Sequence, residues 1–489
     1  MKKNLISISL LCNFLVWGGI ISNVKANISK EKPNIVFILA DDLGWADLPA
    51  YGNTFNEAPN LDKLANEGIR FTNAYAACPV CSPTRASIQS GQYPARVGVI
   101  DFIPGHWRPY EKIIVPQNRT QYLPQEIITI GEAMKSAGYA TGYFGKWHLG
   151  NKLECHPHNQ GYDEANVGQG YYNVKFNPLR AEGSTKRLSG LLADFGEEFI
   201  EEHQNEPFFL FLAHFDVHVQ LDADQELINK YLKKTKVDGY PCNAVYAAMI
   251  EHLDRSVGRI INKLDELELT ENTMVVFFSD NGGLNKRFDL IPLIANNKSH
   301  IYENDSLLYI ASSNKPLRGE KGTLYEGGIR EPMIVKWPAK IKERTVSSAI
   351  ISSVDFFPTF VELAGGKLPG SQVLDGKSIA PELMGKNDEM ERAIFWHYPV
   401  YHHDVPAGAV RKGDWKLIEN METGGVSLYN LNVDIGETIN LTATNPEKTQ
   451  ELYALLKKWQ VGINAALPKS NPDFNESKRG EWGIHPDRK

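Results

Sequence analysis

The segment Cys81-Ser82-Pro83-Thr84-Arg85 places a reactive thiol beside a fixed positive charge. Proline suits the first position of a helix, so Pro83 predicts a helix that begins there, with Cys81 just before its amino terminus. The free N–H groups and the dipole at such a terminus favour an anion, and Arg85 adds to that effect. On physical grounds alone, this setting would make Cys81 a nucleophilic thiolate.

Two pairs of oxygen-bearing side chains follow apolar runs of the sequence. Asp41 and Asp42 come after residues 35–40, and Asp280 and Asn281 come after residues 275–279. Carboxylate and amide oxygens are the ligands that a hard cation such as Ca²⁺ or Mg²⁺ prefers. The alternative for each pair alone is a turn or a helix cap, since Asp and Asn favour both. Together with the other polar segments, they predict a metal site.

Two further segments carry positive charge near predicted strands. Lys146 and His148 follow the apolar run 140–144, and side chains two apart share one face of an extended segment. Lys321 lies in the glycine-rich stretch 317–332, where glycines would let the backbone approach a ligand closely. The spacing of a phosphate-binding P-loop is absent from this stretch. These side chains therefore predict an anion site beside the metal site.

In this order, the motifs resemble those of the formylglycine-dependent sulfatases, from Asn34 to about Asn440. The pattern C-x-P-[S/T]-R, followed by small residues and Gly, is similar to that family's first signature, and residues 317–332 resemble its second. The resemblance implies that a formylglycine-generating enzyme oxidises Cys81 to formylglycine (3-oxoalanine). It also implies a Ca²⁺ ion, favoured over Mg²⁺, held by these ligands: Asp41, Asp42, residue 81, Asp280 and Asn281.

The same resemblance implies a role for each motif residue. Hydrated formylglycine 81 would attack sulfur after losing a proton to an aspartate such as Asp280, and the cationic groups around the sulfate would be Arg85, Lys146 and Lys321. His218, aided by Lys321, would protonate the departing sugar oxygen, and His148 would deprotonate the second hydroxyl so that sulfate leaves. His214, like His218, follows the apolar run 208–213, and it is interpreted as structural.

Apolar runs that alternate with helical patterns would hold these residues in place. Such runs are typical of strands buried on both faces, and we expect them at residues 34–40, 140–144, 208–213, 274–279 and 333–337. Helices are expected at residues 60–67, 128–136 and 246–267. The alternation predicts an α/β fold with a large, mainly parallel mixed sheet between helices, and the resemblance implies its alkaline-phosphatase-like form. Ligands of such sheets bind at the carboxyl ends of the strands.

The chain changes character near residue 391. Short alternating runs at residues 409–418 and 426–431, followed by a helix at 446–461, predict a smaller antiparallel sheet with a terminal helix. The expected parts are therefore a signal peptide (1–26), a catalytic domain (27–385) and a C-terminal α+β subdomain (386–489).

The amino-terminal residues have the features of a signal peptide. Lysines precede an apolar run at residues 5–21, and Val24-Lys25-Ala26 offers a cleavage site. We therefore expect an exported, periplasmic or extracellular protein without a stable membrane span. The net charge of −7 argues against nucleic acid as a partner. Four cysteines after residue 26 are too few for a disulfide framework.

The aromatic and histidine-rich stretch 395–403 suggests where a sugar would bind, because rings stack on sugar faces and imidazoles bond hydroxyl groups. The alternative is a half-buried packing seam. The predicted subsite residues are His397, Tyr398, His402 and Arg411, with residues 101–107 as a further wall.

The overall resemblance to bacterial polysaccharide sulfatases predicts exo action on a sulfated saccharide of the galactose or N-acetylgalactosamine type. Two alternatives remain. One is a phosphonate or phosphate ester hydrolase of the same superfamily, and the other is an inactive glycan-binding homologue.

Overall fold

The computed structural model describes residues 32–105, 107–117, 119–177, 185–287, 291–386 and 392–483. The chain from Lys32 onward forms one compact unit. The predicted signal peptide lies outside the described residues. Among the residues that are described, no helix is both long enough and apolar enough to cross a membrane. The predicted division at residues 385 and 386 stays a prediction.

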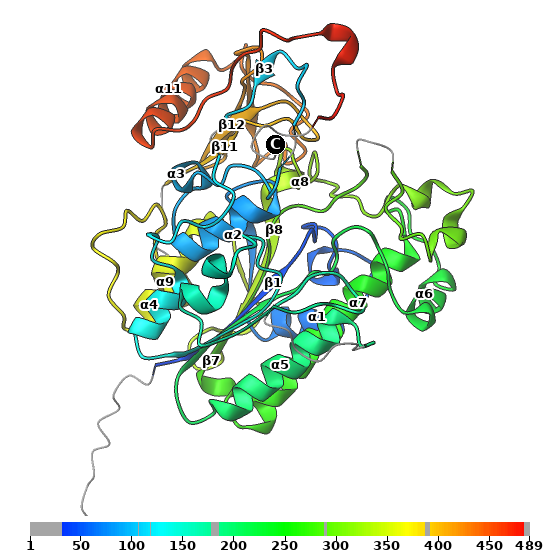
Figure 1. Ribbon diagram of the computed structural model, residues 1–489, viewed down its shortest axis with the longest axis vertical. Coiled ribbons are helices and arrows are strands. Elements are labelled where there is room, and N and C mark those ends of the chain that lie inside the picture. Colours follow the sequence, from blue (N-terminus) through cyan, green and yellow to red (C-terminus); the bar gives the residue numbers. More distant parts are fainter. Residues whose placement is uncertain are drawn as a thin grey trace, which may run out of the picture. The chain divides into compact units, whose positions relative to one another are not determined.

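A nine-stranded sheet forms the centre of the molecule (Figure 1). Its strand order is β10-β2-β8-β7-β1-β6-β4-β5, and β9 pairs with β2. Only β8 is antiparallel to its neighbours, which confirms the predicted mainly parallel sheet. The strands are β1 (Asn34–Ala40), β2 (Ile69–Tyr75), β4 (Ala140–Gly145), β5 (Glu164–Val167), β6 (Phe208–Ala213), β7 (Thr273–Ser279), β8 (Arg330–Lys336), β9 (Thr345–Ser347) and β10 (Ile351–Ser352).

Helices cover both faces of this sheet, as Figure 1 shows. One face packs against α1 (Pro59–Asn66), α5 (Leu188–Glu202), α6 (Gln225–Leu232) and α7 (Ala244–Glu266). The other packs against α2 (Cys81–Ser90), α3 (Pro94–Val97), α4 (Ile130–Ser136), α9 (Phe356–Leu363) and α10 (Ala380–Leu383). Strand β1 serves both layers, because its apolar side chains alternate between the two cores.

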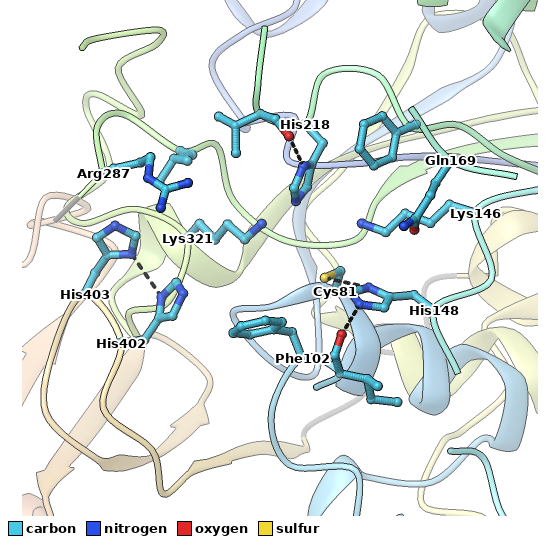
Figure 2. Close-up of a pocket in the computed structure, with 14 residues that line it drawn as sticks. Cys81, Phe102, Lys146, His148, Gln169, His218, Arg287, Lys321, His402 and His403 are labelled. Carbon is cyan, nitrogen blue, oxygen red and sulfur yellow. Dashed lines mark hydrogen bonds between the residues drawn. The ribbon is translucent and has the colours of Figure 1, made fainter. Parts of the chain in front are cut away.

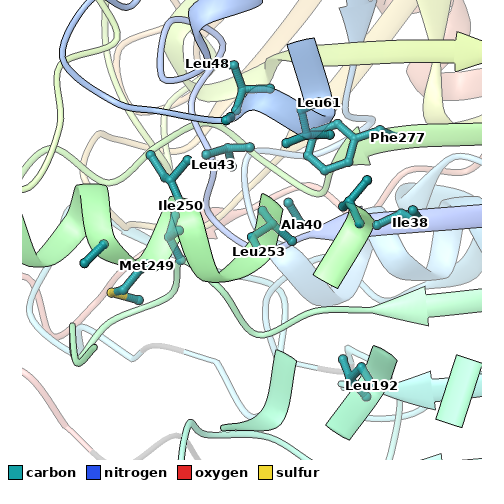
Figure 3. Packing of buried hydrophobic residues seen from close by; sticks show 14 of the residues in the cluster. Ile38, Ala40, Leu43, Leu48, Leu61, Leu192, Met249, Ile250, Leu253 and Phe277 are labelled. Atoms are coloured by element: carbon teal, nitrogen blue, oxygen red, sulfur yellow. The ribbon is translucent and has the colours of Figure 1, made fainter. Parts of the chain in front are cut away.

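Close packing of apolar side chains holds the strand ends in place. Figure 3 shows Ile38 and Ala40 of β1 beside Leu253 of α7 and Phe277 of β7, all fully buried. A buried Ile, Leu or Phe side chain contributes about 1.5–3 kcal/mol relative to an exposed one. The apolar run of β1 thus fixes the position of the carboxylates that follow it.

The direction of the strands brings the polar motifs to one edge of the sheet. Strands β1, β2, β4, β6 and β7 run the same way, so the segments that follow them meet at their shared carboxyl end. Strand β8 runs the opposite way, so its first residues lie at this same edge. The glycine-rich stretch before it, which contains Lys321 and α8 (Glu326–Ile329), therefore reaches the same place.

The helix that carries Cys81 begins earlier than the sequence predicted. Cys81 is its first residue and Val80 is its N-cap, so Pro83 is the third helical residue and not the first. The prediction was wrong because N–H groups throughout the first turn lack helical partners, and proline is tolerated at any of these positions. Cys81 thus lies within the first turn, and the whole helix is buried.

The C-terminal part contains the predicted antiparallel sheet and helix. Its strands are β11 (Ala393–Tyr398), β12 (Ala407–Lys412), β13 (Trp415–Asn420) and β14 (Val426–Asn430), and α11 (Pro446–Gly462) packs against them. The predicted run 409–418 is two strands, which reverse at Gly413 with φ of +58°. A two-stranded ribbon joins β3 (Ile113–Ile114) to β15 (Lys469–Ser470).

A buried lysine connects this C-terminal sheet to the loop that carries Lys321. The Nζ atom of Lys416 on β13 lies 2.8 Å from Glu326 Oε1 of α8 and 2.9 Å from Glu437 Oε1, and all three side chains are fully buried. Replacing Lys416 with alanine is expected to lower the free energy of unfolding by about 3–5 kcal/mol, because buried Glu437 loses its cation and buried Glu326 keeps only its pairing with arginine. Urea denaturation measures the change.

Lys412→Ala is the matched control for this prediction. Its Nζ lies 3.3 Å from Glu451 Oε1 at the surface, where an ion pair contributes about 1 kcal/mol or less. Equal effects of the two substitutions would contradict the structural role of Lys416.

Candidate active site

A pocket of about 370 Å³ opens where the strand ends meet. Figure 2 shows Cys81, Lys146, His148, His218 and Lys321 around it. The sequence predicted each of these residues as part of a site, and the structure brings them together. The remaining lining residues are Phe102, Ile103, Gln169, Phe215, Val219, Leu284, Arg287, His402 and His403.

His148 faces Cys81 with an unprotonated nitrogen. Its Nδ1 lies 3.2 Å from Cys81 Sγ, and its Nε2 lies 2.6 Å from the carbonyl oxygen of Ile103. A carbonyl only accepts hydrogen bonds, so Nε2 carries the proton and Nδ1 presents a lone pair to residue 81. Burial, followed by the charge of Lys146, lowers the pKa of His148 to about 3. His148 is therefore neutral and suited to accept a proton from residue 81.

The backbone at two of these positions is unusual. Asp42 has a φ of +61° and His148 a φ of +62°, in a region that residues other than glycine rarely adopt. Strained conformations of this kind cluster at functional sites, where the surrounding structure enforces them. Both residues lie within three residues of the end of a central strand, whose packing supplies that support.

The predicted metal ligands lie together at the base of the pocket. Asp42 accepts a hydrogen bond from Asn281 Nδ2 at 2.8 Å, and its own N–H lies 3.3 Å from Asp280 Oδ1. Asp41 Oδ1 and Asn281 Oδ1 are buried without a hydrogen-bond partner, an arrangement that a bound cation would satisfy. Ligand atoms of Asp41, Asp42 and His218 also lie within 4.8 Å of one another. These residues fit a divalent cation.

Three buried cations accompany these carboxylates. Lys146 Nζ lies 2.5 Å from Asp41 Oδ2, and Lys321 Nζ lies 2.7 Å from Asp42 Oδ1. Arg85 Nη2 lies 2.7 Å from Asp280 Oδ2. Because the cations match the carboxylates in number, a divalent ion would leave the site with excess positive charge. Such a site suits an anionic substrate.

The pKa values of Asp41 and Asp280, which are neighbours in the site, shift in opposite directions. Burial would raise the pKa of Asp41, but Lys146 and the other nearby cations outweigh it and hold that pKa below its usual value. Burial and the adjacent Asp41 raise the pKa of Asp280.

His218 forms the opposite side of the pocket from His148 (Figure 2). Its Nδ1 lies 2.5 Å from the carbonyl oxygen of Val219, and its Nε2 lies 3.7 Å from Asp42 Oδ2. Burial, followed by the charge of Lys321, lowers the pKa of His218 to about 4. His214 is buried away from the pocket, with Nε2 3.5 Å from Ser256 Oγ. The structure thus separates the two histidines as the sequence predicted.

The sequence model of the Sulfatase family matches residues 33–366. The chain belongs to the sulfatase family. Residues 319–463 also match the model described as N-sulphoglucosamine sulphohydrolase, C-terminal. Membership in this family makes the protein a sulfuric ester hydrolase, as the sequence predicted.

Similar proteins cover almost the whole chain. A sulfatase from Formosa agariphila is 33% identical over 96% of this chain and 95% of its own. An N-acetylgalactosamine-6-O-sulfatase from Bacteroides thetaiotaomicron is 29% identical over 88% of this chain and 93% of its own. The crystal structure of Ps i-CgsB in complex with k-i-k-neocarrahexaose has a TM-score of 0.74 and is 26% identical, covering 92% of this chain and 96% of that one.

The structure separates the four predicted subsite residues of this sulfatase. His402 lines the pocket. His397 is buried, with Nε2 2.8 Å from the carbonyl oxygen of Ala466, and Tyr398 is buried with its hydroxyl 3.3 Å from Asp101 Oδ1. Arg411 lines a different cavity, of about 300 Å³. Most of the stretch 395–403 is therefore buried, which agrees with the alternative interpretation of this stretch as a packing seam.

Several lining residues were missed by the sequence analysis. Gln169 follows β5, and Arg287 lies in the loop after Asp280 and Asn281. The rule that ligands bind at the carboxyl ends of parallel strands could have identified both, since each follows such a strand. His403 was missed although its neighbour His402 was predicted. Phe102 and Ile103 belong to the wall expected from residues 101–107.

Proposed function

We propose that this sulfatase removes sulfate from galactose-type or N-acetylgalactosamine-type units of sulfated glycans, using formylglycine at position 81 and bound Ca²⁺. The observation that carries the proposal is the contact of residue 81 with neutral His148 in a pocket that Lys146 and Lys321 also line. The similar N-acetylgalactosamine-6-O-sulfatase and the complex of Ps i-CgsB with k-i-k-neocarrahexaose support the substrate class.

The position of residue 81 suits the proposed nucleophile. As its hydrate, formylglycine supplies one hydroxyl that attacks sulfur and a second whose deprotonation expels sulfate. His148 Nδ1 already faces this side chain and is unprotonated, so His148 can remove that second proton. The first turn of α2 adds its positive dipole at the same point.

The cations and the metal ligands share the task of binding the sulfate. Asp41, Asp42, Asp280 and Asn281, with residue 81, would hold Ca²⁺, which would supply positive charge to the bound sulfate. Lys146 and Lys321 line the pocket and can contact sulfate oxygens directly. Arg85 lies behind them, where its Nη1 donates to the carbonyl oxygen of Lys146 at 2.6 Å. Arg85 therefore positions Lys146.

Two groups are placed to assist the departure of the sugar oxygen. The bond from His218 Nδ1 to the Val219 carbonyl leaves Nε2 as the nitrogen that exchanges its proton with the substrate. A bound sulfate ester raises the pKa of His218 from its low resting value, because the ester is negatively charged. Lys321 stays protonated, since Asp42 raises its pKa against the effect of burial, and it can therefore assist His218 by stabilising the negative charge that develops on the departing oxygen.

A signal peptide at residues 1–26 exports the chain to the periplasm or the exterior, and a formylglycine-generating enzyme converts Cys81 before folding buries it. The pocket volume of about 370 Å³ suits a terminal sugar unit, which favours exo action.

Parallel assays on sulfate and phosphate esters test the proposed function. Calcium-loaded protein is expected to release sulfate from terminal galactose or N-acetylgalactosamine units with kcat/KM about 100-fold above that for the matching phosphate esters. Dominant phosphate release would instead indicate a phosphonate or phosphate ester hydrolase. Saccharide binding without turnover of either ester would indicate a glycan-binding homologue.

A further inference from the structure

The loop after β6 carries His218, the proposed proton donor to the departing sugar oxygen. A tight turn shapes this loop, because the N–H of His218 donates to the carbonyl oxygen of Phe215 at 2.9 Å. Both residues line the active-site pocket, and the dashed line at His218 in Figure 2 marks its bond to the Val219 carbonyl. The loop belongs to no helix or strand, so contacts with other segments must hold the imidazole in place.

Backbone hydrogen bonds attach the middle of this loop to the proposed metal site. The N–H of Asp41 donates to the carbonyl oxygen of Asp216 at 3.0 Å, and the N–H of Val217 donates to the carbonyl oxygen of Asp41 at 2.7 Å. These two bonds continue the pairing of β1 with β6 beyond the ends of the strands. They fix residues 216 and 217, whereas the position of His218 depends further on side chains.

A buried ion pair holds the loop from the side of α5. Arg187, the N-cap residue of α5, pairs through Nη2 with Asp216 Oδ1, and only 6% of Arg187 and 1% of Asp216 is exposed. Arg187 Nη1 also donates to the carbonyl oxygen of Asp222 at 2.7 Å. The forked guanidinium thus joins a residue before His218 to one after it, which a single ammonium group would do less well.

Tyr171 connects this ion pair to His218 itself. Its hydroxyl donates to the carbonyl oxygen of His218, and its ring centroid lies 4.4 Å from the guanidinium carbon of Arg187. The same ring meets Phe215 edge to face at 5.1 Å between centroids, and Phe215 lies 5.0 Å from the His218 ring. Tyr171 is buried and is not one of the described residues that line the pocket. It therefore affects a bound substrate only through the residues that it holds.

We propose that Tyr171 and the Arg187–Asp216 ion pair are positioning residues for proton transfer by His218. When the S–O bond to the sugar breaks, its electron pair stays on the sugar oxygen, and His218 Nε2 gives that oxygen a proton. The transfer requires the imidazole within hydrogen-bond reach of the oxygen, and a displacement of about 1 Å costs about 100-fold in rate. This inference rests on the proposed function and extends the role given there to His218.

Two sulfate esters with different leaving groups test this role in the calcium-loaded enzyme. A sulfated galactoside releases a sugar alcohol, which needs a proton, whereas para-nitrophenyl sulfate releases a phenolate that is stable without one. Tyr171→Phe removes only the hydroxyl and is expected to lower kcat for the galactoside by about 10-fold, while kcat for the aryl ester stays within about 3-fold. Arg187→Lys keeps the charge without the fork and is expected to show the same selective loss.

A double-mutant cycle with His218→Ala gives a second readout, on the galactoside alone. His218→Ala is expected to lower kcat by about 100-fold or more, and Tyr171→Phe should then have no further effect, because the imidazole that it positions is absent. Tyr231→Phe is the matched control. Its hydroxyl is buried in the same core, 2.8 Å from Glu251 Oε2, and its removal is expected to leave kcat for both esters unchanged. Thermal unfolding of each variant confirms that it is folded.

Equal losses for the two esters in Tyr171→Phe, or losses that add fully to that of His218→Ala, would overturn the inference and leave the proposed function intact. Tyr171→Phe alone decides this if Arg187→Lys does not fold. Equal losses for the two esters in His218→Ala would contradict the role that the proposed function gives to His218, and the inference with it. Failure of the wild type to release sulfate from the galactoside would instead contradict the proposed function.

Discussion

Replacing Cys81 with alanine is expected to reduce sulfate release by about 10⁴-fold or more, because an alanine side chain offers no hydroxyl to attack sulfur. The fold should survive, since alanine is the best helix former and residue 81 is the first residue of α2. Turnover of a sulfate ester and the thermal midpoint measure the two effects. A variant that retains turnover would contradict the role of residue 81.

Cys81→Ser isolates the second hydroxyl of the proposed nucleophile. A serine hydroxyl can take the sulfuryl group, but it leaves His148 without a second proton to remove, so sulfate is not expelled. The expected result is a single turnover and a protein heavier by one SO₃ group, seen by intact mass. Cys78→Ala is the matched control, because Cys78 is buried in the preceding loop and should be dispensable for turnover. Repeated turnover by Cys81→Ser would contradict the mechanism.

Removing calcium is expected to lower activity by about 100-fold or more and to lower the thermal midpoint, with both restored by added Ca²⁺. The buried oxygens of Asp41 and Asn281 lack hydrogen-bond partners, and a cation bound only to the folded state satisfies them. Such a ligand at 100 times its Kd stabilises the fold by about 2.7 kcal/mol. Activity after chelation and scanning calorimetry with and without Ca²⁺ provide the measurements.

Two variants locate the calcium effect. Asn281→Ala removes a proposed ligand and is expected to reduce the calcium-induced rise in the midpoint. Asp47→Asn should keep that rise, because Asp47 is a nearby buried carboxylate whose oxygens accept bonds from Tyr240, Tyr246 and the N–H of Gly44. Full activity of the chelated wild type, with no shift on adding Ca²⁺, would contradict the metal site.

The sequence predicted the central strands well, because strands buried on both faces are continuous apolar runs. The run 34–40 coincides with β1, and the polar residues directly after it mark the strand's carboxyl end. The shared direction of the strands then explains why motifs far apart in sequence meet in one pocket. The helix start predicted at Pro83 was wrong, because proline is tolerated throughout a first helical turn.

The walls of the pocket were harder to predict than its base. His397 and Tyr398 lie on β11, and the sequence alone does not say which face of a strand meets the core. Arg287 and His403 come from loops whose paths depend on long-range packing, such as that of His402 against Gly322. Motifs that end strands of the central sheet could therefore be recognised from the sequence, whereas the loop residues that line the pocket could not.

The mass of the tryptic peptide of residues 71–85 tests the central claim most directly. This peptide contains Cys78 and Cys81, so reduction and alkylation provide an internal control. In active enzyme, residue 81 is expected to have lost H₂S and gained one oxygen atom, with a single alkyl label on Cys78. Active enzyme whose peptide carries two alkyl labels and no aldehyde would contradict the account.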